Sequence, residues 1–241
     1  MPMADSIKKG DFVEVDYTGR LTTGEVFDTT EEKVARANGL YNDRTKFSPT
    51  TVCIGEGQIL PGLELEMENK EIGKEYHIKI QPEHGFGKRD VKKIKIVPAS
   101  TFKEHNVHPQ KGLQVEVDGE MGLITGMSGG RVIVNFNHPL AGKEVEYTFT
   151  IRKKITDHKE QLLSFLQTTM RLPKEKIKVE VQGEKAEVEL PFQLPPQFTE
   201  MMSKKLGELT KLKEITIKAG SRVEGKSEHK TNHIHGPHCQ H

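Results

Sequence analysis

Apolar and polar residues alternate along several short stretches of this chain, and that alternation predicts half-buried β-strands. It is clearest at 76–80 and 145–151, where successive apolar side chains fall on one face of an extended backbone. A further β-rich run covers 12–17, and a turn at Thr23-Gly24 separates it from a second short strand. The N-terminal part of the chain is therefore expected to form an antiparallel sheet.

Only short stretches in this part of the chain are expected to be helical. Leu63, Leu65 and Met67 lie in a short acidic segment that is expected to be a helix. The irregular, polar stretch 29–49 is expected to be a loop that holds one short helix at 31–37.

The composition changes at residue 88 to a charged, β-rich segment that continues to residue 136. Its Asp118-Gly119 dipeptide stands between two apolar runs, which is typical of a tight β-hairpin. A flexible stretch at 128–130 separates two further predicted strands. Residues 88–136 are therefore predicted to be a small inserted β-domain.

A third region, 156–220, has the order helix, strand, strand, helix, strand. Asp157 is a candidate N-cap for the first helix, and Gln182-Gly183 joins two alternating runs into a hairpin. This order predicts a compact α+β module. The polar tail, 221–241, is not expected to fold by itself.

Composition and charge narrow the classes of protein. The 241 residues include 36 Lys and Arg against 35 Asp and Glu, so the net charge of +1 lacks the field that attracts nucleic acid. No stretch approaches the roughly 18 consecutive apolar residues of a membrane span, and the N-terminus lacks a signal-peptide pattern. Cys53 and Cys239 form no disulfide framework. We therefore expect a cytoplasmic protein with no nucleic acid or membrane partner.

Four ordered blocks resemble one enzyme family. They are VDYTGRLTTGEVFDTT at 15–30, IGEGQILPGLE at 54–64, PEHGFG at 82–87 and NHPLAGKEVEYTF at 137–149. In order and spacing they resemble the FKBP family of peptidyl-prolyl cis-trans isomerases, and most of all its SlyD-like branch and long archaeal members. The resemblance implies an α+β fold in which an antiparallel half-barrel, 1–87 and 137–155, wraps a short helix and is interrupted by a chaperone insert.

The resemblance also implies which residues form the catalytic site. The matching positions are Tyr17, Phe27, Asp28, Ile59, Leu60, Leu63, Phe86 and Tyr147. The aromatic residues and Leu63 would line a proline pocket, Ile59 and Leu60 would close one wall, and the Leu60 N–H would donate to the substrate carbonyl. Asp28 would polarise or orient the peptide. Leu63 and Phe86 replace the tryptophan and tyrosine of many members, which implies altered activity.

Taken without the resemblance, the same residues have simpler explanations. Scarce aromatic side chains on alternating strands most often fill a core, and a carboxylate such as Asp28 most often stabilises a turn. The implied reaction is nevertheless consistent with them. An X-Pro bond isomerises slowly because amide resonance is lost in the twisted state, so an apolar slot that binds the twisted form best lowers the barrier without a nucleophile or a cofactor.

The insert contains a patch suited to apolar contacts. Met121, Leu123, Ile124 and Met127 lie among glycines, and flexible thioether side chains suit promiscuous apolar contact. The resemblance implies that the insert holds unfolded client chains. The alternative is that these residues form the core of the insert itself.

The C-terminal tail carries candidate metal ligands. Imidazole and thiolate groups favour Ni, Zn, Co or Cu, and nothing in the pattern selects among them. The candidates are His229, His233, His235, His238, Cys239 and His241. The dispersed histidines elsewhere, such as His77 and His138, are expected to be structural or surface residues.

Two functions from different classes follow. The first is a peptidyl-prolyl isomerase and folding chaperone that acts on X-Pro bonds of unfolded or nascent chains. The alternative is a non-enzymatic holdase or metal carrier that acts through the insert and the tail. Because the 156–220 module is small for independent stability, it is expected either to dock on the FKBP-like domain or to pair with a second copy. We favour the second copy, with Phe198, Met201 and Met202 as the candidate contact face.

Overall fold

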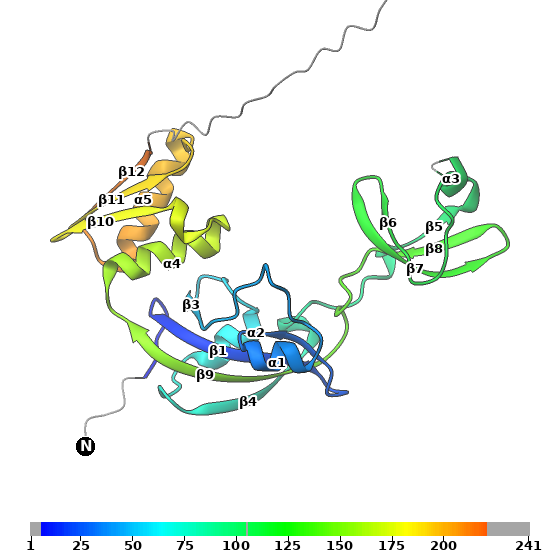
Figure 1. Ribbon diagram of the computed structural model, residues 1–241, viewed down its shortest axis with the longest axis horizontal. Coiled ribbons are helices and arrows are strands. Elements are labelled where there is room, and N and C mark those ends of the chain that lie inside the picture. The colour runs from blue at the N-terminus through cyan, green and yellow to red at the C-terminus, as the bar shows by residue number, and fades with distance from the viewer. Residues whose placement is uncertain (1–5, 105, 221–241) are drawn as a thin grey trace, which may run out of the picture. The chain divides into compact units, whose positions relative to one another are not determined.

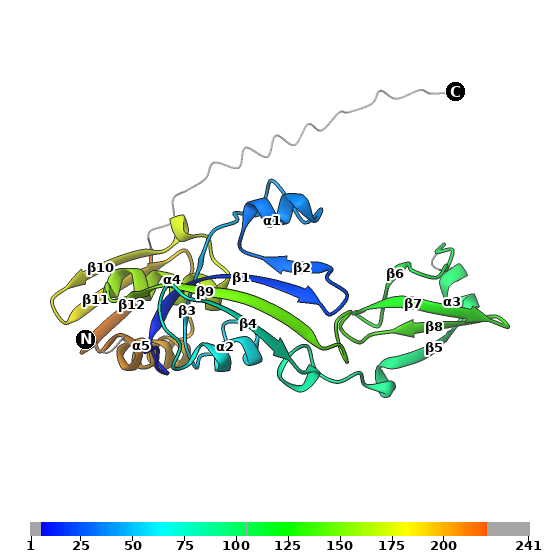
Figure 2. The same ribbon diagram turned by 90° about the horizontal axis from the view of Figure 1, so that it is seen from below.

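The computed structural model describes residues 6–104 and 106–220, shown from two sides in Figures 1 and 2. The chain divides into two compact units, and the boundary between them in the sequence falls between Leu172 and Pro173. Within the described residues, no helix is both long and apolar enough to span a membrane.

The first unit contains a five-stranded antiparallel sheet with the order β2-β1-β9-β4, in which β3 also pairs with β1. Its strands are β1 (Phe12–Leu21), β2 (Val26–Thr29), β3 (Thr50–Cys53), β4 (Glu75–Ile80) and β9 (Val145–Ile155). Register shifts at Glu14/Val15 and Gly19/Arg20 bend β1, since a bulge increases the local twist of a strand. The sheet therefore curls into the predicted half-barrel.

A short helix, α2 (Pro61–Met67), lies on the concave side of these strands (Figure 1). Leu63 and Met67 are buried in one core with Phe149 and Ile151 of β9, whereas Leu65 is exposed. This pattern follows from helical periodicity, because positions four apart share a face and the position between them does not. The predicted loop holds α1 (Glu32–Ala37), as expected.

The insert is a separate four-stranded antiparallel sheet with the order β5-β8-β7-β6 (Figure 2). Its elements are β5 (Ile94–Pro98), α3 (Ala99–Glu104), β6 (Gln114–Val117), β7 (Glu120–Ser128) and β8 (Arg131–Asn135). Asp118 and Gly119 both have positive φ, which confirms the predicted tight hairpin. The helix α3 was not predicted, because its six residues are too few to show helical periodicity. Two short 3-10 helices, Pro82–His84 and Val91–Lys93, lead into the insert.

The apolar patch predicted in the insert is partly core and partly exposed surface. Ile124 is fully buried in a core with Phe102, Val115, Val132 and Val134. By contrast, the Met121 and Met127 side chains are 62% and 49% exposed, and Leu123 is also exposed. The core therefore accounts for Ile124 only, and the other three side chains face solvent.

A long helix, α4 (His158–Met170), follows β9 and begins at the predicted cap, where the Asp157 carboxylate accepts a hydrogen bond from the Glu160 N–H at 2.8 Å. Its contacts with β3 group it with the first unit. The boundary between the two compact units therefore lies after the end of α4. The module predicted from the sequence began before this helix.

The second unit contains a three-stranded sheet with the order β10-β11-β12 and one long helix. Its elements are a 3-10 turn (Lys174–Lys176), β10 (Lys178–Gln182), β11 (Lys185–Leu190), α5 (Pro196–Thr210) and β12 (Glu214–Ala219). The first two strands are antiparallel, and α5 crosses over to place β12 parallel to β11. The predicted order of elements in this region is confirmed.

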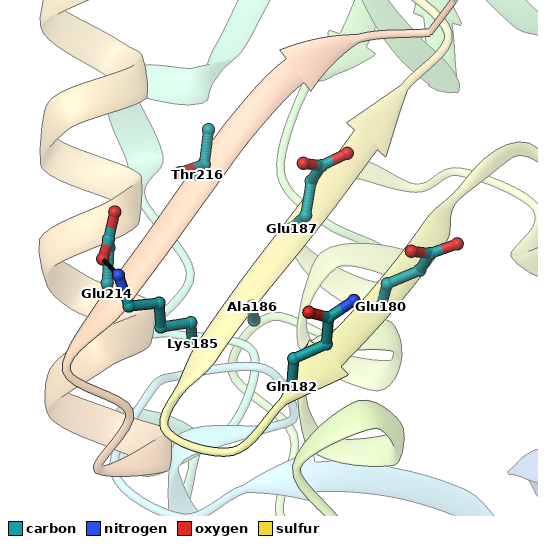
Figure 3. Close-up of a pocket in the computed structure, with 7 residues that line it drawn as sticks. All are labelled: Glu180, Gln182, Lys185, Ala186, Glu187, Glu214 and Thr216. Atoms are coloured by element: carbon teal, nitrogen blue, oxygen red, sulfur yellow. Dashed lines mark ion pairs between the residues drawn. The ribbon is translucent and has the colours of Figure 1, made fainter.

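Alternation gives this sheet one polar face. Figure 3 shows Glu180, Gln182, Glu187 and Thr216 projecting from it, together with an ion pair of 2.5 Å between Lys185 and Glu214. Apolar side chains such as Val188 and Leu190 are buried instead. The polar face has the mixed charge of a solvated surface.

Candidate active site

Four of the predicted aromatic residues come together in the first unit, although they lie on separate segments of the chain. The Tyr147 ring of β9 lies 5.9 Å from the Tyr17 ring of β1 and 5.8 Å from the Phe27 ring of β2, measured between centroids. Phe86, after the 3-10 turn that follows β4, meets Phe27 edge to face at 5.6 Å. The edge-to-face geometry is the favoured contact between aromatic rings. We call these four residues the aromatic cluster.

Gly19 leaves room for this cluster. In the β1–β9 register it lies opposite Tyr147. A Cβ atom at Gly19 would stand 2.8 Å from the Phe27 ring and 2.9 Å from the Tyr147 ring, closer than side chains normally approach. The absence of a side chain therefore lets two aromatic rings close over the strand.

Thr30 fixes the backbone beside the cluster. Its hydroxyl accepts a hydrogen bond from the Tyr17 N–H at 3.0 Å, and its own N–H donates to the Tyr17 carbonyl at 3.0 Å. These two hydrogen bonds lie between the part of β1 that pairs with β3 and the part that pairs with β2. They satisfy the N–H and carbonyl groups of Tyr17, which neither strand pairs with. Thr30 thereby holds Phe27 and Asp28, just before it in sequence, next to Tyr17.

The Asp28 carboxylate is half-buried and accepts hydrogen bonds from two donors. Burial raises its pKa, and hydrogen bonds from the Thr29 N–H and the Tyr17 hydroxyl oppose that increase. Burial, reinforced by the charge of Asp28, raises the pKa of Tyr17 to about 12. The pKa of Tyr147 is raised by the same causes. Both phenols are therefore protonated donors at neutral pH.

Ile59, Leu60 and Leu63 form an aliphatic part of the same core. Leu63 is 1% exposed, whereas Ile59 and Leu60 are half-buried and pack against the buried cluster. Leu60 is the N-cap of α2, so its N–H precedes the hydrogen-bond ladder of the helix.

Side-chain hydrogen bonds anchor the loop that carries Ile59 and Leu60. Both carboxylate oxygens of the buried Glu64 accept hydrogen bonds from the Gly57 N–H, at 3.1 and 3.3 Å. The Gln58 side-chain oxygen accepts one from the Cys53 N–H at 2.8 Å. These two contacts join the loop to the end of β3 on one side and to α2 on the other.

The structure thus brings seven of the eight predicted site residues into or against one core, and the eighth, Asp28, is hydrogen-bonded to Tyr17. Of the seven, Tyr147 and Leu63 are buried as deeply as ordinary core residues. Sequence reasoning missed Gly19 and Glu64. A glycine inside a strand is a sign of close approach, but the predicted run ended before Leu21, the last residue of β1, so Gly19 was not recognised as an interior residue. The role of Glu64 depends on its contact with the Gly57 N–H in the preceding loop, and no local sequence pattern marks such a contact.

No metal site occurs in the part of the chain that the structure describes, since none of its His, Cys, Asp and Glu side chains gather in threes. The predicted ligands lie outside the described residues. They are His229, His233, His235, His238, Cys239 and His241. The metal site in the tail stays a prediction.

Two family models match this chain. The model described as FKBP-type peptidyl-prolyl cis-trans isomerase matches residues 4–103, and the model described as FKBP26, IF domain, matches residues 95–140. The first match ends before β9, although β9 is central to the same sheet.

Several curated proteins are similar over most of their own length. The short-type peptidyl-prolyl cis-trans isomerase of Methanocaldococcus jannaschii is 35% identical over 150 residues, which cover 62% of this chain and 95% of the relative. The SlyD proteins of Treponema pallidum and Haemophilus influenzae are each 28% identical, over 65% and 60% of this chain and 84% and 70% of the relatives.

Proposed function

Since the chain belongs to the family of FKBP-type peptidyl-prolyl cis-trans isomerases and is a SlyD-like member, we propose that its aromatic cluster catalyses isomerisation of X-Pro bonds in unfolded or nascent chains. The observation that carries this proposal is the convergence of four aromatic rings, from four separate segments, beside a half-buried carboxylate that is hydrogen-bonded to Tyr17. Such a site offers apolar contact to a pyrrolidine ring and a few fixed polar groups.

The proposed mechanism is differential binding. The planar X-Pro bond must lose its resonance as it twists, and the apolar walls remove water that stabilises the planar, polar amide. Tyr17, Phe27, Phe86 and Tyr147 would grip the proline ring, with Leu63 beneath them. Binding the twisted form more tightly by 1.4 kcal/mol raises the rate about tenfold.

The polar groups would orient the peptide. The Leu60 N–H would donate to a substrate carbonyl, and the Ile59 and Leu60 side chains would flank it. Asp28 would polarise the twisted amide through its charge and would not transfer a proton. Phe86 has no hydroxyl, so one donor available to members with tyrosine at this position is missing here.

The insert would hold the client chain as a chaperone domain. A cavity of about 690 Å³ lies beside its edge strand β6, with Val97, Phe102, Val107, Leu113 and Val115 among its lining residues. An edge strand offers unpaired backbone groups, so an extended apolar segment of an unfolded chain would find both hydrogen bonds and apolar contacts. Tethering the client near the aromatic cluster would raise the local concentration of its X-Pro bonds.

Two further parts of the proposal concern assembly and metal. We propose a homodimer through α5, where Phe198 and Met201 are 56% and 57% exposed. Sedimentation of the full chain should show a dimer that the double variant Phe198→Lys/Met201→Lys loses and Leu65→Lys, at an exposed site on α2, retains. A monomeric wild type would exclude the dimer.

We also propose a cytoplasmic location and divalent-metal binding by the tail, with no cofactor needed for isomerisation.

A protease-coupled assay on a proline tetrapeptide tests the enzymatic function. Phe27→Leu should reduce kcat/KM at least tenfold, because it removes the ring that contacts both Tyr147 and Phe86. Tyr76→Leu is the matched control, since Tyr76 stacks on Phe149 at 5.4 Å outside the aromatic cluster. A wild-type protein that suppresses aggregation of unfolded chains but does not turn over the tetrapeptide would establish the non-enzymatic holdase instead.

A further inference from the structure

A histidine extends the aromatic cluster on its solvent-exposed side. The His138 ring lies parallel to Phe86, with 4.7 Å between centroids and 4° between planes. Phe86 in turn meets Phe27 edge to face. His138 is exposed, whereas Phe86 and Phe27 are half-buried. The sequence alone gave no role to this histidine beyond that of a surface residue.

His138 is fixed by the segment that leads out of the insert. The His138 Nδ1 atom accepts a hydrogen bond from the Leu140 N–H at 3.2 Å, which places the proton of the neutral ring on Nε2. The preceding residue, Asn137, accepts from the Asp90 N–H and donates to the Asp90 carbonyl, each at 2.8 Å. The Gly142 N–H donates to the Gly87 carbonyl at 2.8 Å. His138 therefore lies between two bridges that join the entering and leaving segments of the insert.

The backbone around Phe86 is held in place, because the Gly85 and Gly87 N–H groups both donate to the Pro82 carbonyl, at 3.1 and 2.7 Å. Phe86 lies between Gly85 and Gly87, and Gly87 has a φ of +80°, a conformation that other residues rarely adopt. The fixed backbone leaves only the side-chain torsions of Phe86 to be set by its neighbours. The ring contacts with Phe27 and His138 are what set the direction of the Phe86 side chain.

We propose that His138 is a positioning residue for the isomerase reaction: it holds the Phe86 ring against Phe27, so that this wall of the site is formed before the peptide binds. The inference rests on the proposed function of the aromatic cluster. Preorganisation lowers the cost of ordering a side chain on binding, so its loss should raise KM more than it lowers kcat.

Ring contacts test the positioning directly. In the NMR spectrum of the full chain, nuclear Overhauser effects between the Phe86 and Phe27 ring protons should be present in the wild type and in His138→Phe, which retains a stacking ring. They should weaken or vanish in His138→Ala. His108→Ala, at an exposed histidine of the insert, is the control and should retain them. Unchanged ring contacts in His138→Ala would overturn the proposal.

Kinetics test whether the positioning matters for the reaction. In the tetrapeptide assay, His138→Ala should lower kcat/KM about fivefold, mainly through KM, which is the size expected for one aromatic stacking contact. His138→Phe should recover most of that loss. An active wild type with unchanged kcat/KM in His138→Ala, or an equal loss in His138→Phe, would overturn the proposal. An inactive wild type would instead contradict the proposed function, and the ring contacts would still decide the role of His138.

Discussion

Gly19 lies opposite Tyr147 across the β1–β9 pair, and a methyl group on Gly19 would come within 2.9 Å of the Tyr147 ring. The gap left by this glycine is occupied by the rings of Phe27 and Tyr147, which converge from two other strands. The aromatic cluster therefore requires a residue without a side chain at its centre.

Replacing Gly19 with alanine should accordingly disrupt the site. Overpacking of this kind costs about 1–3 kcal/mol of stability, and displaced Phe27 and Tyr147 rings should lower kcat/KM more than tenfold. Thermal unfolding and the tetrapeptide assay measure the two effects. Gly126→Ala is the matched control, since its nearest contact would be an ordinary 3.5 Å in the insert. Gly19→Ala with full activity would show that these rings need not close over β1.

Asp28→Asn should increase stability while it decreases activity. Because burial raises the pKa of Asp28 in the folded state, its contribution to stability is fully present below the unfolded-state pKa, about 3.9. That contribution is lost as the pH rises through the folded-state pKa. The asparagine variant does not ionise and escapes this loss.

The pH dependence of unfolding checks this assignment. In denaturant titrations, the variant should gain stability relative to the wild type as the pH rises through the acidic range, and kcat/KM at pH 7 should be several-fold lower. Asp43→Asn, at an exposed loop position, should change neither quantity. A wild type that instead loses stability relative to the Asp28→Asn variant as the pH falls would reverse the sign and exclude a raised pKa.

Glu64 should support the site without touching the substrate. Removing its carboxylate in Glu64→Ala leaves the Gly57 N–H without its acceptor and frees the loop of Ile59 and Leu60. We expect kcat/KM to fall about tenfold and stability to fall by about 1–3 kcal/mol. Glu66→Ala, an exposed position on the same helix, is the control. Equal activity in the two variants would show that this loop does not need the Glu64 contact.

The insert should be needed for protein clients and not for short peptides. Replacing residues 92–136 with a short loop, which retains Asp90 and its bridge to Asn137, should leave tetrapeptide turnover within about twofold of the wild type, because the aromatic cluster lies outside the replaced segment. Catalysed refolding of a protein limited by X-Pro isomerisation should slow strongly, since the tether that raises the local concentration is lost. Refolding catalysed as well as by the full chain would remove the client-holding role.

The sequence was most informative where the pattern is local. Alternation over 145–151 predicted β9, and the Asp118-Gly119 dipeptide predicted the turn between β6 and β7. The four family-like blocks contain all of the aromatic cluster. Gly19 and Glu64 escaped notice because each acts through strand register or a contact with another segment. The same holds for α4, whose capping residue was predicted from sequence but whose contacts with β3 were not.

Exchange NMR on a peptide with a single X-Pro bond tests the central claim most directly, because it measures rate and equilibrium together. With a small fraction of a molar equivalent of the protein, the cis-to-trans and trans-to-cis rates should rise by the same factor. The cis:trans ratio should not change, since a catalyst lowers one shared barrier. Phe27→Leu should lose most of that acceleration. An uncatalysed exchange rate in the presence of folded wild-type protein would contradict the account.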